Sequence, residues 1–151
     1  MEIRDFLLPA DVMLDVRASD KTRLLRRLSA QAANEVGLDP DDVSNQIAKR
    51  EELGSTGVGN GVALPHARLR GLKAPFGLIA RLRHAIDFEA IDDRPVDVVF
   101  LLLLPEAADG AQLNPLASVA RALRDPAVLQ RVRGASDRET LFIAIANSNA
   151  G

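Results

Sequence analysis

The sequence of 151 residues contains no cysteine, so it has neither a disulfide framework nor thiolate chemistry. This absence fits a reducing compartment. The longest apolar run, Val98 to Leu104, is far shorter than the roughly 18–20 residues that span a membrane. The N-terminal segment Met1 to Asp5 is too charged, and too short in apolar residues, for a signal peptide. We therefore expect a cytoplasmic protein without a membrane span.

Histidine is also scarce, and this argues against a metal site. His66 and His84 are the only two histidines, and neither has a carboxylate or a second histidine at a ligand-motif spacing. The acids Asp92, Asp93 and Asp97 are typical of a solvated turn followed by a strand. The formal net charge of −2 argues against bulk binding to nucleic acid. We expect no metal, no cofactor and no nucleic-acid partner.

The organisation of the chain indicates one α/β domain. We find no repeat, low-complexity segment or linker, so residues 1–151 are expected to form a single domain with its core at about 5–147. Strand and helix patterns alternate, which is typical of the α/β class. Strands are expected at 12–16, 76–82 and 96–104; helices are expected after Asp20 and Asp39, over 113–123 and 126–132, and after a capping box at 136–139.

The most informative stretch is a glycine-rich segment that leads to His66. Four glycines lie between Gly54 and Gly61, and the apolar run Val62 to Leu64 follows them as a short expected strand. His66 comes just after this strand, and arginines stand at both ends of the segment. On spacing alone, a plain turn beside a surface histidine explains the segment equally well. The glycines form neither a Walker A motif nor a dinucleotide fingerprint.

The functional interpretation is a histidine that carries a phosphoryl group. Neutral imidazole is a nucleophile near pH 7, because its unperturbed pKa is about 6.5. A phosphoryl dianion on the ring needs fixed donors. Backbone amides of the glycine-rich segment, with Gly57 among them, can point into one concavity. Candidate phosphate-binding side chains are the hydroxyls of Ser55 and Thr56 and the guanidinium groups of Arg50 and Arg68.

Residues 50–66, with the sequence REELGSTGVGNGVALPH, closely resemble a known active-site signature. It is that of phosphotransferase-system enzyme IIA proteins of the fructose/mannitol type, and the nitrogen-regulatory branch is the most similar. The likeness continues in residues 88–97, in the apolar run that ends at Leu104, and in the helix from Leu116 to Leu123. The resemblance implies a mixed β-sheet flanked by helices, the enzyme IIA fold.

The resemblance also implies roles for single residues. His66 occupies the position of the phosphorylated histidine, Arg50 matches an arginine that lines the site, and Arg68 falls where the family commonly has a basic residue. The phosphoryl donor implied is an HPr-like phosphocarrier protein, fed ultimately from phosphoenolpyruvate. One position departs from many relatives, because Gln112 stands where they have a second histidine. Glutamine can donate an N–H to a phosphoryl oxygen but cannot become a cation.

Three functions stay open at this point. The leading hypothesis is a regulatory phosphocarrier, a phosphotransferase component that accepts a phosphoryl group on His66 and signals by its phosphorylation state. Regulatory targets such as potassium-transport regulators or sensor kinases are implied by the branch resemblance alone. The alternatives are a sugar-specific enzyme IIA that passes phosphate to a IIB domain, and a partner-binding module that has lost phosphorylation. His84 is expected to be an exposed turn residue without a catalytic role.

Overall fold

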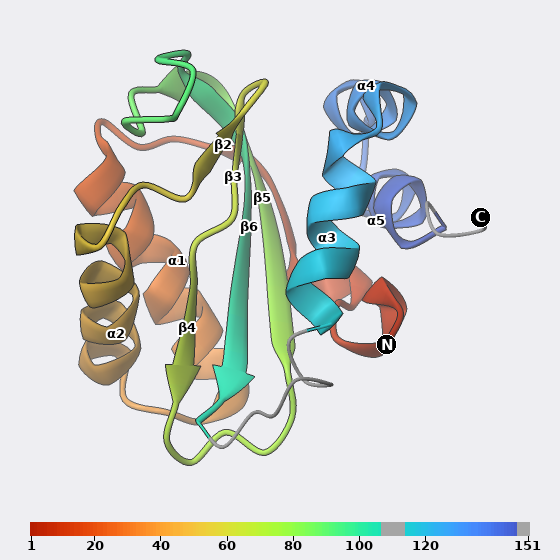
Figure 1. The fold of residues 1–151 in the computed structure, drawn as a ribbon. Helices are drawn as coiled ribbons and strands as arrows, with labels where there is room; N and C mark the ends of the chain where they lie inside the picture. The colour runs from red at the N-terminus through yellow and green to blue at the C-terminus, as the bar shows by residue number, and fades with distance from the viewer. Residues whose placement is uncertain (107–113, 148–151) are drawn as a thin grey trace.

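The computed structural model describes residues 1–106 and 114–147 (Figure 1). Two short 3₁₀ helices, Ile3–Asp5 and Pro9–Asp11, open the chain. The strands are β1 (Val12–Val16), β2 (Gly57–Gly59), β3 (Val62–Ala63), β4 (His66–Leu69), β5 (Phe76–Ile86) and β6 (Val96–Pro105). The helices are α1 (Lys21–Val36), α2 (Pro40–Glu52), α3 (Asn114–Arg124), α4 (Pro126–Gly134) and α5 (Arg138–Ala146).

The strands form one mixed sheet in the order β1-β5-β6-β3-β2, and β4 also pairs with β6. β5 and β6 are antiparallel, whereas β1 runs parallel to β5. β3 and β4 both run parallel to β6, and their registers place them one after the other along it: Val62 lies opposite Val98, and His66 opposite Leu102. The expected α/β class with a mixed sheet is confirmed.

β6 is buried on both faces, which explains its long apolar run. Val98, Phe100, Leu102 and Leu104 belong to the core cluster that includes residues of α3, α4 and α5. The intervening Val99, Leu101 and Leu103 belong to the cluster that includes residues of α1 and α2. This alternation follows from the two-residue period of a strand. Figure 1 shows the result as three layers, with α1 and α2 on one face of the sheet and α3 to α5 on the other.

Among the described residues, four helices begin at an aspartate that accepts a hydrogen bond from a backbone N–H of the first turn. These N-cap residues are Asp20, Asp39, Asp125 and Asp137. Proline occupies the first helical position of α2 and of α4, where its missing N–H costs nothing. Gly37 ends α1 in the left-handed conformation, with φ of 72°.

Three local features differ from the expectation. No strand was expected at 66–69, but β4 occupies His66–Leu69, so His66 follows the short strand β3, as expected, and also begins a strand of its own. β5 runs four residues further than expected, to Ile86, and exposed His84 therefore belongs to a strand and not to a turn. The N-cap of α5 is Asp137, one residue after the start of the expected capping box. β4 is short and only half apolar, so its period is too brief to recognise in the sequence.

Candidate functional site

His66 is the first residue of β4, and its place in the strand sets the direction of its side chain. Alternation along β4 buries Ala67 and Leu69 among the residues under α1 and α2. His66 and Arg68 consequently share the opposite face of the strand. His66 is half-buried there, and Arg68 is exposed. The sequence-predicted pair of histidine and arginine is thus brought onto one surface.

A backbone carbonyl fixes the imidazole of His66. Nδ1 lies 2.8 Å from the carbonyl oxygen of Leu64, two residues earlier. A carbonyl oxygen only accepts, so Nδ1 must carry the proton in this contact. In the neutral ring, Nε2 then holds the free lone pair. The partner for the second ring nitrogen, which the sequence did not reveal, is therefore the main chain of the segment between β3 and β4.

The surroundings of His66 favour its neutral form. Burial, as the main cause, lowers the pKa of the imidazole below its ordinary value of 6.5, and the guanidinium of Arg50 acts in the same direction. The hydrogen bond to Leu64 and the carboxylate of Glu51 partly oppose this by raising the pKa. The lowered pKa leaves the ring unprotonated at Nε2 at pH 7. A histidine in this state is a competent nucleophile.

The pocket in front of His66 is positively charged. It has a volume of about 390 Å³ and is lined by Gln46, Lys49, Arg50, Leu53, His66, Ala67, Arg68, Leu104 and Leu116. Three of these residues are cations and none is a carboxylate. Within residues 1–106 and 114–147, none of the three cations forms an ion pair. The charge of such a pocket attracts an anion, such as a phosphoryl group.

α2 and its C-cap residue Leu53 supply four of the nine residues of this lining. Gln46, Arg50 and Leu53 recur at spacings of four and three residues, so they project from the same side of the helix. Arg50 is held in place because its Nη1 donates a hydrogen bond to the carbonyl oxygen of Gly54 at 3.0 Å. Sequence reasoning missed Lys49 and Gln46, although their helical spacing from Arg50 was a usable signal.

The first half of the glycine-rich segment lies outside the lining of the pocket that contains Arg50 and Arg68. Ser55, Thr56 and Gly57 are not among the described residues that line the His66 pocket. Ser55 Oγ donates to the carbonyl of Phe88 at 2.8 Å and accepts from the amide of Gly57 at 3.1 Å. The Thr56 hydroxyl donates to Glu51. These groups have partners within the fold, and their contact with phosphate stays a prediction. Gln112 lies outside the described residues.

The second half of the glycine-rich segment forms a tight hairpin. Asn60 and Gly61 connect β2 to β3 with φ of 58° and 79°. A two-residue turn with positive φ at both positions strongly favours asparagine followed by glycine. Gly61 also lies so close to Arg133 and Asp97 that an added Cβ would be 2.4 Å from the arginine side chain. These two residues are therefore explained by the backbone path of the hairpin.

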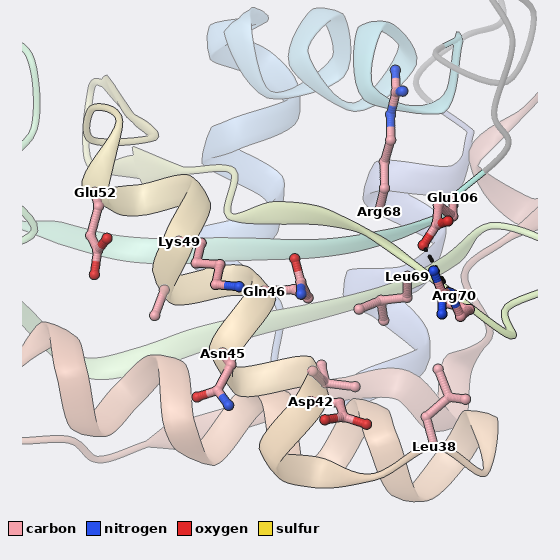
Figure 2. Close-up of a pocket in the computed structure, with 12 residues that line it drawn as sticks. Leu38, Asp42, Asn45, Gln46, Lys49, Glu52, Arg68, Leu69, Arg70 and Glu106 are labelled. Atoms are coloured by element: carbon pink, nitrogen blue, oxygen red, sulfur yellow. Dashed lines mark ion pairs between the residues drawn. The ribbon is translucent and has the colours of Figure 1, made fainter.

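A second cleft adjoins the His66 pocket along the seam between α2 and β4 (Figure 2). It has a volume of about 570 Å³ and shares Gln46, Lys49 and Arg68 with the pocket. Asp42, Glu52 and Glu106 also line it, and Glu106 forms an ion pair with Arg70 at 3.6 Å. Figure 2 shows Arg68 extending away from the residues of α2. The smaller pocket better fits an anion, because it contains the nucleophile and no carboxylate.

The described residues contain no cluster of three or more histidine, cysteine, aspartate or glutamate side chains suited to a metal ion. They also contain no helix long and apolar enough to cross a membrane.

Comparison with known proteins assigns the chain to a family. The family described as "Phosphoenolpyruvate-dependent sugar phosphotransferase system, EIIA 2" matches residues 5–148. The chain belongs to this EIIA family. A nitrogen regulatory protein of Bradyrhizobium diazoefficiens is 40% identical over 146 residues, which are 97% of this chain and 95% of that protein. The resemblance to the nitrogen-regulatory branch is confirmed.

Solved structures agree with this assignment. The crystal structure of nitrogen regulatory protein IIA-Ntr from Neisseria meningitidis superposes with a TM-score of 0.90 at 33% identity, covering 95% of this chain and 98% of the other. The mannitol IIA of Escherichia coli superposes with a TM-score of 0.75 at 19% identity, covering 93% and 99%. The second comparison shows that the fold is shared. EIIA proteins are components of a phosphotransferase system, so the coarse class of the expected activity is confirmed.

Proposed function

We propose that the chain is a regulatory phosphocarrier that accepts a phosphoryl group on Nε2 of His66. The donor is the phosphohistidine of an HPr-like carrier protein. The observation that supports this most is the state of His66: a neutral imidazole, with Nδ1 bound to a carbonyl, in a pocket with three cations and no carboxylate. The free lone pair of Nε2 then meets an electrophilic phosphorus without first losing a proton.

The transfer balances without any further reactant. The Nε2 lone pair of His66 forms the new N–P bond as the N–P bond of the donor breaks, and the donor imidazole recovers its electron pair. The proton on Nδ1 stays in its hydrogen bond to the Leu64 carbonyl, where it disperses the positive charge that develops on the ring. The reverse reaction uses the same geometry, so the group can be passed on.

The cations stabilise the phosphorylated product. Lys49, Arg50 and Arg68 line the pocket that contains His66, and charge-assisted hydrogen bonds to phosphate are the stronger kind. The sequence-predicted contributions of Ser55, Thr56, Gly57 and Gln112 to phosphate binding belong to the same proposal. Exposed Leu53 at the rim, with 84% of its surface accessible, offers apolar area to a docking protein.

A regulatory role is favoured over sugar transport by the relatives. The 40% identical protein and the superposed Neisseria protein are both named nitrogen regulatory proteins. The phosphoryl group changes the charge around His66 and thereby alters binding to regulated proteins in the cytoplasm, such as potassium-transport regulators or sensor kinases. The phosphorylated and unphosphorylated forms are the two signalling states.

Reconstitution with purified phosphoenolpyruvate-dependent donor proteins tests the proposal. Intact-protein mass spectrometry is expected to show one added phosphoryl group that is labile in acid and absent from His66→Ala. His84→Ala is the matched control, because it removes the other histidine, and it should be phosphorylated like the wild type. Phosphorylation that persists in His66→Ala would refute the proposal.

The family description, with its sugar phosphotransferase system, keeps sugar transfer as a second candidate. Mixing the phosphorylated protein with fructose- or mannitol-type IIB separates the two: rapid transfer supports the sugar role, and retention of the phosphoryl group supports regulation. A module that has lost phosphorylation would instead bind its partners equally well before and after replacement of His66 by alanine.

A further inference from the structure

Glu51 is a buried carboxylate that the proposed transfer does not use. It follows Arg50 in the last turn of α2, but its side chain is only 7% exposed. Successive helical residues point about 100° apart, so Glu51 and Arg50 lie on different sides of α2. Lys21, at the start of α1, places Nζ 3.2 Å from the Glu51 carboxylate and is only 15% exposed. Removing two charges from water costs free energy, so a buried ion pair needs further hydrogen bonds to its charged groups.

A continuous set of hydrogen bonds connects Glu51 to the imidazole. The Thr56 amide donates to both carboxylate oxygens of Glu51, at 3.2 and 3.1 Å, and the Thr56 hydroxyl donates to the same carboxylate. The Leu64 amide donates to the Thr56 carbonyl at 3.0 Å. The Leu64 carbonyl accepts from Nδ1 of His66 at 2.8 Å. The contacts made by the Thr56 amide, the Leu64 amide and the imidazole all lie in the normal distance range.

We propose that Glu51 and Thr56 are positioning residues for phosphoryl transfer, which hold the Leu64 carbonyl where it fixes the Nδ1–H tautomer of His66. This inference rests on the proposed function of His66. Neither residue lines the pocket, and their hydrogen bonds reach the imidazole through Leu64; this positioning role is separate from any contact of Thr56 with phosphate.

The local structure explains why the position of Leu64 depends on this carboxylate. Thr56 and Leu64 pair just outside the β2–β3 hairpin, beyond the pair of Gly57 and Ala63. Gly54, two residues before Thr56, has φ of 153°, a conformation that glycine adopts freely. Thr56 is only 4% exposed, so water cannot readily replace Glu51 as the partner of its amide and hydroxyl. Loss of the carboxylate therefore loosens the base of the hairpin that carries Leu64.

Glu51 also acts on His66 by its charge, and the two effects can be separated. The Glu51 carboxylate raises the pKa of His66, against the lowering by burial and by Arg50. Glu51→Gln removes both this charge and part of the hydrogen bonding, so it should lower the pKa further. Thr56→Val removes only the hydroxyl and keeps the charge. An effect common to both variants belongs to positioning.

The test combines imidazole ¹⁵N NMR with phosphorylation kinetics in Thr56→Val, Thr56→Ser and Glu51→Gln. The chain has only two histidines, so exposed His84 supplies an internal reference in each spectrum. In the wild type and Thr56→Ser, neutral His66 should be protonated at Nδ1. In Thr56→Val and Glu51→Gln, the Nε2–H tautomer should appear, and the phosphorylation rate constant should fall about tenfold, as for the loss of one hydrogen bond.

Asp97→Asn is the matched control, since it also changes a carboxylate that anchors this hairpin. Asp97 pairs with Arg133 at 2.8 Å, and Arg133 donates to the carbonyl of Asn60 in the turn. This variant should be less stable but should keep the wild-type tautomer and rate. The proposal is overturned if Thr56→Val and Glu51→Gln behave like the control. If Glu51→Gln does not fold, the comparison of Thr56→Val with Thr56→Ser decides the question.

The outcomes also separate this inference from the proposed function. A wild-type protein that is never phosphorylated, yet shows a tautomer shift in Thr56→Val, would refute the phosphocarrier role and keep the positioning of the ring. Normal phosphorylation on His66, with an unchanged tautomer in both variants, would refute the positioning role alone.

Discussion

Replacement of Arg50 by methionine should slow phosphorylation of His66 by about 10- to 100-fold. Arg50 lines the pocket, and hydrogen bonds to a charged group contribute about 1.5–3 kcal/mol. A loss of this size in the transition state corresponds to roughly one to two powers of ten in rate. Methionine keeps the length of the aliphatic stem and removes the charge. The variant should also be less stable by about 0.5–1.5 kcal/mol, because the bond from Arg50 to the Gly54 carbonyl is lost.

The assay is a stopped reaction of the variant with phosphorylated donor protein, at several concentrations and at pH 8. Arg50 lowers the pKa of His66, so its removal should raise that pKa. At pH 8 the ring is neutral in both proteins, which removes this effect from the comparison. Arg70→Met is the matched control, since Arg70 is exposed and lies outside the His66 pocket. A rate for Arg50→Met within twofold of the wild type would refute the reasoning.

Three further predictions concern stability and pH. Ser29→Ala should raise the free energy of unfolding by about 1 kcal/mol in urea titrations, because the Ser29 hydroxyl is fully buried and has no hydrogen-bond partner among the described residues; a loss of stability would contradict this. Arg81→Met should lower the free energy of unfolding by about 2–4 kcal/mol in the same measurement, because Nη1 of Arg81 donates to three carbonyls at the C-terminal end of α4. Phosphorylation of this variant, at a temperature where it is folded, should be unchanged. The lowered pKa of His66 means that the unfolded chain binds more protons between the folded pKa and 6.5, so stability should decrease as the pH falls through this range. His66→Gln should lack that component of the pH dependence of unfolding.

The helices and the long strands were predictable because the sequence features that mark them, N-cap residues and apolar runs, agree with where these elements pack in the fold. Asp20 and Asp39 are strong N-caps, and the apolar run of β6 is buried on both faces as such a run indicates. β4 was missed because pairing with β6, which cannot be read from the sequence, is what places Ala67 and Leu69 in the core. A four-residue strand has too few side chains for its period to be read.

The candidate site was predictable in its charged residues but not in its backbone. The chemistry of His66, Arg50 and Arg68 is visible in the sequence, and the structure brings the three residues into one pocket. The Leu64 carbonyl carries no side-chain signal, so the partner of Nδ1 could be found only in three dimensions. The spacing of the glycines led us to expect backbone amides that point into one concavity. In the structure, Gly61 is instead explained by the tight turn that it forms with Asn60.

The most direct test of the central claim is to identify which atom of His66 carries the phosphoryl group. ³¹P–¹⁵N correlation NMR on the phosphorylated protein, labelled with ¹⁵N-histidine, identifies that atom. We expect a single N–P bond at Nε2 of His66, with Nδ1 still hydrogen-bonded to Leu64. A bond at Nδ1, or at His84, would contradict the proposed chemistry.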